Sequence, residues 1–179
     1  MTPTVLSVNI SKTHSFSKFP EKIVHLVKGQ GIEGDAHKGE YVKHRSRVKA
    51  NPKNKNLRQV HLIHQELFNE LREKGYIIKP GEIGENITTQ HLDILDLPKG
   101  TVLSIGSSEI ELTGLRNPCN QLNDFQKGLM NELIYKNELG QIIRKCGVMG
   151  IVKKSGSIKP GDVIQVTYPP KPFQRLEKV

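Results

Sequence analysis

Short stretches in which apolar and polar residues alternate recur along this chain, and this period of two is typical of β-strands with one buried face. The pattern covers residues 4–10 and 58–63, and residues 23–27 form a largely apolar run that also predicts a strand. The alternation continues on both sides of Gly106, which predicts a β-hairpin over residues 101–114. Three further stretches between residues 147 and 168 repeat it. We therefore expect a series of short strands.

Two other stretches have the 3.6-residue period of amphipathic helices. Residues 64–75 place Leu67, Phe68 and Leu71 on one face, with Gly75 just beyond the last turn. A second helix is expected to begin at Asn123 or Asp124 and to end before Gly140. Its apolar face would consist of Phe125, Leu129, Met130, Leu133 and Ile134.

The composition agrees with a mainly β fold. Val and Ile together number 30, whereas Ala, Leu and Met together number 22, and β-branched side chains fit a pleated surface better than a helix. A length of 179 residues suits one domain spanning residues 1–179. We predict a small β-barrel, with a sandwich as the alternative, carrying two or three short helices. The Pro-rich tail at about 169–179 is expected to be peripheral.

Three glycines after the second strand, Gly29, Gly31 and Gly34, have the G-x-G-x-x-G spacing of a dinucleotide-binding turn. That motif requires a helix after its last glycine and an acidic residue about 20 residues later. The stretch that follows has no apolar helical stripe. We interpret the glycines instead as a loop that needs positive φ angles.

The net charge of +9 is concentrated in one segment. Residues 38–58 contain eight basic side chains and one acidic one, and so contribute +7. An exposed loop at about 38–57 could keep the protein soluble, clamp a phosphorylated small molecule, or act as a nucleic-acid arm. Tyr41 is the one aromatic residue between positions 37 and 60, which argues against base stacking and hence against nucleic acid.

The sequence predicts a cytoplasmic protein without a membrane anchor. The N-terminus lacks a basic region followed by an apolar one, and no apolar run approaches the roughly 18 residues that span a bilayer. The two cysteines lack C-x-x-C spacing.

Cys119 is the leading candidate for chemistry. It follows a predicted strand, three residues after Arg116, and a nearby cation favours the thiolate that binds metals or carries sulfur. The alternative is a buried free cysteine, and this alternative fits Cys146 better because an apolar strand follows it directly. His37 follows Asp35 by two residues in the glycine-rich turn, whereas His61 and His64 have no further ligand at zinc-site spacing.

Four stretches, in this order, resemble the MOSC domain family, which is named for the C-terminal domain of molybdenum cofactor sulfurase. They are GIEGDAHKG with RQVHLI, PGEIGENITT leading to LPKGTVLSIG, EIELTGLRNPC, and GVMGIV with IKPGDVIQV. They run from about residue 31 to residue 167. The long basic insertion before Arg58 is not a core feature of the family.

The resemblance implies a barrel-like β domain whose cysteine carries a persulfide or ligates the molybdenum of a pterin cofactor. It also implies roles for individual residues. Catalytic roles fall to Asp35, His37, Arg116 and Cys119, cofactor binding to Lys38, Arg58, Asn86 and Asn117, and molybdenum ligation to Cys119. Gly34 and Gly84 would be structural. Relatives occur alone or fused to a pyridoxal-phosphate cysteine desulfurase, a domain missing here, so pyridoxal phosphate could act only on a separate partner.

Two functions remain open alongside the weaker nucleic-acid hypothesis. The first is an enzyme that binds the phosphorylated molybdenum-pterin cofactor through Cys119 and reduces N-hydroxylated compounds or transfers sulfur. The second is a non-enzymatic carrier that receives persulfide sulfur. The expected protein partners are a cysteine desulfurase or an electron donor.

Overall fold

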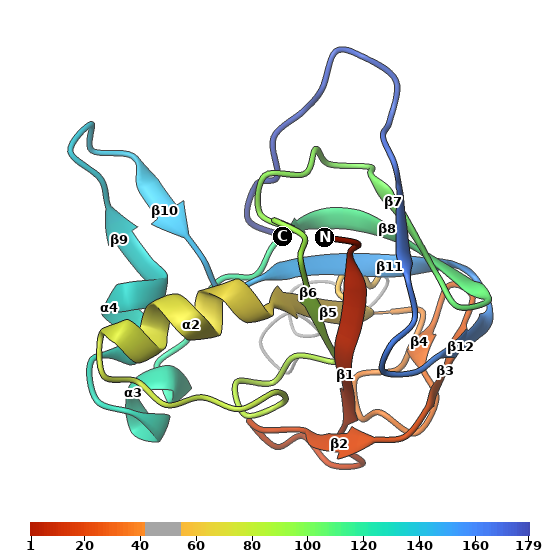
Figure 1. Cartoon of the computed structure of the whole chain (residues 1–179), viewed down its shortest axis with the longest axis horizontal. Coiled ribbons are helices and arrows are strands. Elements are labelled where there is room, and N and C mark those ends of the chain that lie inside the picture. Colours follow the sequence, from red (N-terminus) through yellow and green to blue (C-terminus); the bar gives the residue numbers. More distant parts are fainter. Residues whose placement is uncertain (42–54) are drawn as a thin grey trace.

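A computed structural model of the protein describes residues 1–41 and 55–179, and most of its strands belong to one large sheet (Figure 1). Its members are β1 (Thr4–Ile10), β2 (Phe19–Glu21), β5 (Val60–His64), β6 (Ile87–Gln90), β7 (Val102–Ile105), β8 (Ser108–Leu115), β11 (Val148–Lys154) and β13 (Ile164–Thr167). They lie in the order β13-β7-β8-β11-β5-β6-β1-β2. The hairpin predicted around Gly106 is confirmed as β7 and β8.

The remaining strands form two smaller units. One is a three-stranded sheet of β3 (Val24–Val27), β4 (Gly31–Ile32) and β12 (Gly156–Ile158). The other is the hairpin of β9 (Ile134–Lys136) and β10 (Ile142–Arg144), which projects from the left side of the view in Figure 1.

Three helices in the described part of the chain lie together on one side of the large sheet: α2 (Gln65–Glu73), α3 (Gln121–Phe125) and α4 (Leu129–Leu133) (Figure 1). The strands β5 and β6 are parallel neighbours, and the chain between them contains helix α2. Such a crossover is needed because a tight turn cannot join parallel strands. None of the helices described is long and apolar enough to cross a membrane.

The prediction of a mainly β fold with short helices is confirmed, but the sheets do not form a closed barrel. The large sheet curves until a bridge between Thr4 and Val163 brings β1 beside the chain that enters β13. Backbone hydrogen bonds from Val5 to Asp162 (2.9 Å) and from Ile164 to Pro3 (2.9 Å) support this contact. The large sheet is therefore curved, and resembles a barrel only loosely.

The prediction of a single second helix is wrong. Residues 121–133 form two five-residue helices, α3 and α4, and residues 134–144 form the β9–β10 hairpin. Gly128 breaks the helix because its φ of +88° is left-handed. Asn123 still acts near a helix start, since its side chain accepts a hydrogen bond from the Met130 N–H of α4 at 3.0 Å.

The strand β5 separates two hydrophobic clusters. Val60 and Leu62 belong to the cluster inside the large sheet, whereas Ile63 belongs to the cluster under the helices. All five residues of β5 are buried. Cys146 lies in the second cluster and is fully buried, which confirms the prediction of a buried free cysteine.

Two peripheral segments frame this core. The predicted basic loop at 38–57 falls largely on residues 42–54, which lie outside the described residues. The Pro-rich tail is exposed over residues 170–175, but its end packs along β8, where Leu176 is buried and Val179 N–H donates to Leu115 at 3.2 Å.

Truncating Leu62 to Ala should lower the free energy of unfolding by about 2–5 kcal/mol, because its side chain is fully buried between neighbouring strands. The matched control is Leu139→Ala, since Leu139 is 81% exposed and its loss should change stability by less than about 0.5 kcal/mol. Urea unfolding of both variants measures the difference. Equal losses would contradict the assignment of β5 to the core.

Candidate functional site

Asp35 is a buried carboxylate that receives hydrogen bonds from its own turn and from segments far from it in the sequence. It follows Gly34, whose φ of +77° turns the chain after β4. The Lys18 ammonium donates to Oδ2, as does the Asn86 amide at 3.0 Å. The backbone N–H of His37 donates to Oδ1 at 2.9 Å. The Asp35 carboxylate thereby joins the loop before β2, the glycine-rich turn and the start of β6.

This environment keeps Asp35 ionised. Burial alone would raise the pKa of its carboxyl, but hydrogen bonds from His37 and the charge of Lys18 outweigh burial and hold the pKa well below its usual range. Lys18 and Asp35 are 6% and 7% exposed, so their ion pair is almost entirely withdrawn from water.

A hydrogen-bond chain continues from Asp35 toward Arg116. Asn86 Oδ1 accepts the backbone N–H of His61 at 3.1 Å. Burial, aided by the charge of Arg116, lowers the pKa of His61 well below its usual value, so its imidazole is neutral. Because Arg116 can only donate, Nδ1 of His61 accepts from its Nη1 at 3.4 Å, and Nε2 donates to the Cys146 carbonyl at 2.8 Å.

Arg116 is fixed in place without a carboxylate partner. It follows β8, and its backbone N–H donates to Gly147 at 3.0 Å. Its Nη1 donates to the carbonyl of Ile83 at 2.6 Å and lies 3.8 Å from Cys146 Sγ. Among the residues described, no carboxylate forms an ion pair with Arg116, although its charge interacts with that of Glu85, so an anion can contact the guanidinium directly.

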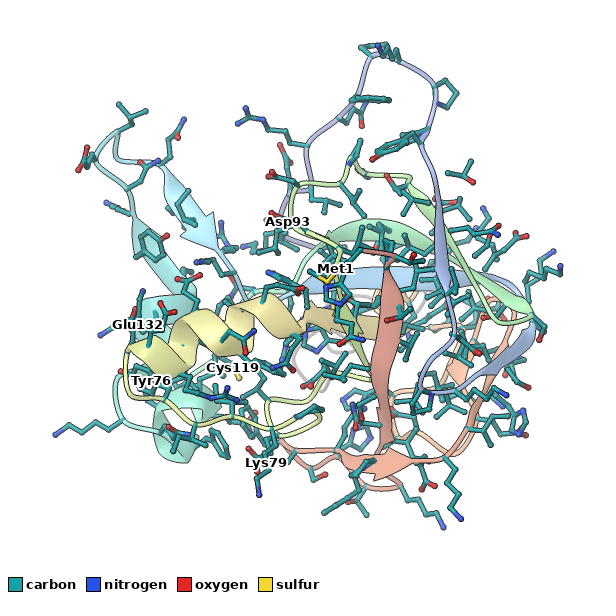
Figure 2. All side chains as sticks on the ribbon, viewed as in Figure 1. Met1, Tyr76, Lys79, Asp93, Cys119 and Glu132 are labelled. Carbon is teal, nitrogen blue, oxygen red and sulfur yellow. The ribbon has the colours of Figure 1, made fainter. Side chains whose placement is uncertain are left out.

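Cys119 lies at the end of the same loop, just before α3, and is half-buried. In Figure 2 it is seen beneath α2, on the side of the molecule that carries α3 and α4. Its thiol donates to Gln121 Oε1 at a long 3.5 Å. The preceding Pro118 is buried, and the Asn117 amide oxygen accepts from Arg144 Nε at 3.1 Å. On the other side, the Leu122 N–H donates to the Cys119 carbonyl at 3.1 Å, so the backbone that carries the thiol is held before and after it.

The structure brings some of the predicted site residues together. Asp35, His37, Asn86 and Arg116 belong to one connected network, and Cys119 follows three residues later. Other predicted residues lie around it: Lys38 is half-buried in the Asp35 turn, Arg58 is half-buried before β5, and Asn117 is held by Arg144. All hydrogen-bonding groups of the Asn86 amide are engaged within the protein.

Sequence reasoning missed three residues of this network: Lys18, His61 and Glu85. Lys18 lies in a polar stretch with no pattern that marks it as buried. His61 carried a signal, since it occupies an inward position in an apolar strand, where a histidine must find hydrogen-bond partners. Glu85 stands directly before Asn86 in the stretch PGEIGENITT.

Glu85 is a fully buried acid with one unpartnered oxygen. Its Oε1 accepts hydrogen bonds from the Gly81 N–H and from the Thr88 hydroxyl at 2.9 Å. Its Oε2 has no partner among the described residues, nor does the buried Nδ2 of Asn9. Burial raises the pKa of Glu85 to about 7, although the hydrogen bonds and the charge of Arg116 oppose that shift.

The MOSC domain family model matches residues 39–165, more than half of the chain, and the chain therefore belongs to the MOSC domain family. Domains of this class are associated with the molybdenum cofactor. Asn86, Arg116 and Cys119 lie inside the matched segment, whereas Asp35 and His37 precede it.

Solved structures with the same fold include bacterial relatives of low sequence identity. YuaD from Bacillus subtilis is 23% identical, with a TM-score of 0.77 over 95% of this chain and 98% of that one. YiiM from Geobacillus stearothermophilus is 20% identical, with a TM-score of 0.67 over 92% and 75%. YiiM from Escherichia coli is 16% identical, with a TM-score of 0.67 over 97% and 73%. No curated protein matched the sequence.

Asp35→Asn should destabilise the protein by about 3–5 kcal/mol, because it leaves the Lys18 ammonium buried without a carboxylate. The double variant Lys18→Met, Asp35→Asn should recover most of this loss, since it removes both charges together and keeps an amide oxygen as an acceptor for the remaining donors. Urea unfolding measures all variants. Lys153→Met is the control, because Lys153 pairs with Glu111 at the surface and should contribute less than about 1 kcal/mol. A double variant as unstable as the single one would contradict the account.

Proposed function

We propose that this MOSC domain binds a molybdenum-pterin cofactor, with Cys119 as the protein ligand to molybdenum, and uses it for reduction of N-hydroxylated compounds. The observation that carries the proposal is a half-buried thiol three residues after a fixed cation that forms no ion pair with a carboxylate of the described residues. Cys119 and Arg116 are three residues apart on a loop that is held by the Arg116–Ile83 hydrogen bond before the cysteine and by the Leu122 N–H, which donates to the Cys119 carbonyl at 3.1 Å, after it. Membership in a family associated with the cofactor supports the assignment.

The residues present fit such a group. Within the described chain there is no cluster of three or more His, Cys, Asp or Glu side chains that could enclose a bare metal ion. A single soft thiolate suits a metal that already carries sulfur ligands from its own pterin. The cation of Arg116 suits the phosphate of such a cofactor. The donor set therefore matches a cofactor that brings its own coordination shell.

The chain's own residues would have distinct tasks. Cys119 would hold the metal, and Arg116 would bind and orient the anionic part of the ligand. Two further basic residues are candidates for anion contacts: Lys38, which lies in the Asp35 turn, and Arg58, which lies just before β5. His37 would exchange a proton with the substrate; its side chain is 48% exposed and its Nδ1 lies 3.2 Å from Asp35, which supports this role. When bound, the cofactor supplies two-electron redox chemistry.

Protein purified from a host that makes the cofactor should contain molybdenum and pterin in similar amounts. Cys119→Ala should lose most of both, because the thiolate that anchors the metal is gone. Cys146→Ala is the control, since Cys146 is fully buried in the hydrophobic cluster and should leave the content unchanged. Elemental analysis and fluorescence of the oxidised pterin provide the measurement. Negligible content in wild type and variants alike would reject the proposal.

The second candidate function is a persulfide carrier that exchanges sulfur with a cysteine desulfurase. It is favoured by one observation: the Cys119 thiol is half-buried, and among the described residues its hydrogen bond is to Gln121 at 3.5 Å. A thiol in this setting is accessible to a protein partner.

Incubation with a desulfurase and cysteine should add one sulfur atom to the protein under this second function. Intact mass spectrometry detects the adduct, and Cys119→Ala should abolish it while Cys146→Ala retains it. An adduct that persists in Cys119→Ala would assign the sulfur to another residue. Absence of any adduct on the cofactor-free wild type would remove this candidate.

A further inference from the structure

Glu85 has no task in the proposed function, yet it is fully buried and only half satisfied. Oε2 of Glu85 and Nδ2 of Asn9 both lack partners among the residues described. Both side chains border the Gly81 turn: the Gly81 N–H donates to Glu85, and a Cβ at Gly81 would lie 3.0 Å from Asn9 Cγ. A buried carboxylate oxygen left without a donor favours binding a proton, because ionisation there is not stabilised by hydrogen bonding.

The charges around Glu85 are those of the candidate anion site. The Arg116 guanidinium packs against the backbone just before Glu85: its Nη1 donates to the Ile83 carbonyl at 2.6 Å, and a Cβ at Gly84 would lie 3.6 Å from its Nη2. Arg116 and Lys18 are the cations that interact electrostatically with Glu85. Asp35 neutralises Lys18, and the Cys146 thiol interacts with Glu85 but burial raises its pKa and keeps it neutral. The imidazole of His61 is neutral as well. Thr88 of β6 donates its uncharged hydroxyl to the carboxyl, and the uncharged Asn9 of β1 lies beside the Gly81 turn.

The formal charge of this buried cluster therefore depends on Glu85. With Glu85 ionised, two carboxylates balance Lys18 and Arg116. With Glu85 protonated, the cluster carries one net positive charge, which Arg116 presents to a ligand. A buried charge interacts strongly with its neighbours because little water screens it.

We propose that Glu85 is the proton-holding counter-ion of the Arg116 anion site, so that binding of an anion at Arg116 is accompanied by uptake of a proton on Glu85. The inference rests on the anion site of the proposed function, but it does not require that the anion be a molybdenum cofactor. The proton comes from solvent and remains on the carboxyl while the anion is bound. The same linkage makes anion affinity higher at low pH.

Inorganic sulfate is a suitable probe because it remains a dianion throughout the neutral range. Its dissociation constant for the full-length protein, measured at constant ionic strength, should rise roughly 3- to 10-fold between pH 6 and pH 8, because one proton is coupled to binding near the Glu85 pKa of about 7. Glu85→Gln should bind sulfate with an affinity that varies much less over this range. Glu82→Gln removes the same charge from a half-exposed neighbour, which accepts from the Lys79 N–H, and should keep the wild-type pH dependence.

Carboxyl carbon NMR of wild-type protein provides a second measurement that does not depend on the stability of a variant. The Glu85 resonance should titrate near neutral pH, and saturating sulfate should move its midpoint to higher pH. An unmoved midpoint with sulfate bound, or the full pH dependence persisting in Glu85→Gln, would overturn this inference and leave the proposed cofactor site standing. Failure of sulfate to bind at all would overturn the inference as well. Failure of the proposed function would instead appear as absence of molybdenum and pterin from the purified wild-type protein.

Discussion

The ionised carboxylate of Asp35, held in a nearly dry environment, organises the candidate site. It accepts from Lys18, from the His37 backbone and from Asn86, three segments that are far apart in the sequence. A buried carboxylate is tolerated only when a cation and hydrogen-bond donors compensate for lost hydration. The three segments must therefore meet at this point, and the position of Asn86 in turn sets that of His61.

The network transmits this constraint to the loop that carries Cys119. His61 is neutral and buried, and its two nitrogens fix the Arg116 guanidinium on one side and the Cys146 carbonyl on the other. Arg116 also donates to Ile83, so its guanidinium has little freedom before a ligand arrives. A cation placed in advance in this way binds an anion at a smaller entropic cost.

Much of the fold could be predicted from the sequence because strand periodicity is a local signal. Residues 4–10 form β1, and the hairpin around Gly106 is present. The prediction failed over residues 121–144, where a stripe with helical spacing spans Gly128. Its left-handed φ divides the stripe, and the apolar residues on each side pack against the helical cluster as two short helices. The curvature of the large sheet, which does not close into a barrel, could not be predicted either, because it depends on pairing between residues far apart in the sequence.

The candidate site was predictable in part, since Asp35, Asn86 and Arg116 stand in recognisable stretches. Lys18 and Glu85 could not be found in this way, because their importance depends on burial. Lys18 is brought against Asp35 by the tertiary fold alone, and Glu85 is conspicuous only once its unpartnered oxygen is seen. Charge counting placed most of the positive charge in the segment before Arg58, whereas the described network uses Lys18 and Arg116.

The central claim is that Cys119 is the residue through which a molybdenum cofactor is held. Molybdenum K-edge absorption of cofactor-loaded protein, normalised to bound metal, tests it most directly when wild type is compared with Cys119→Ser. The account predicts one sulfur ligand fewer per molybdenum in the variant. The same number of sulfur ligands in both proteins would contradict it.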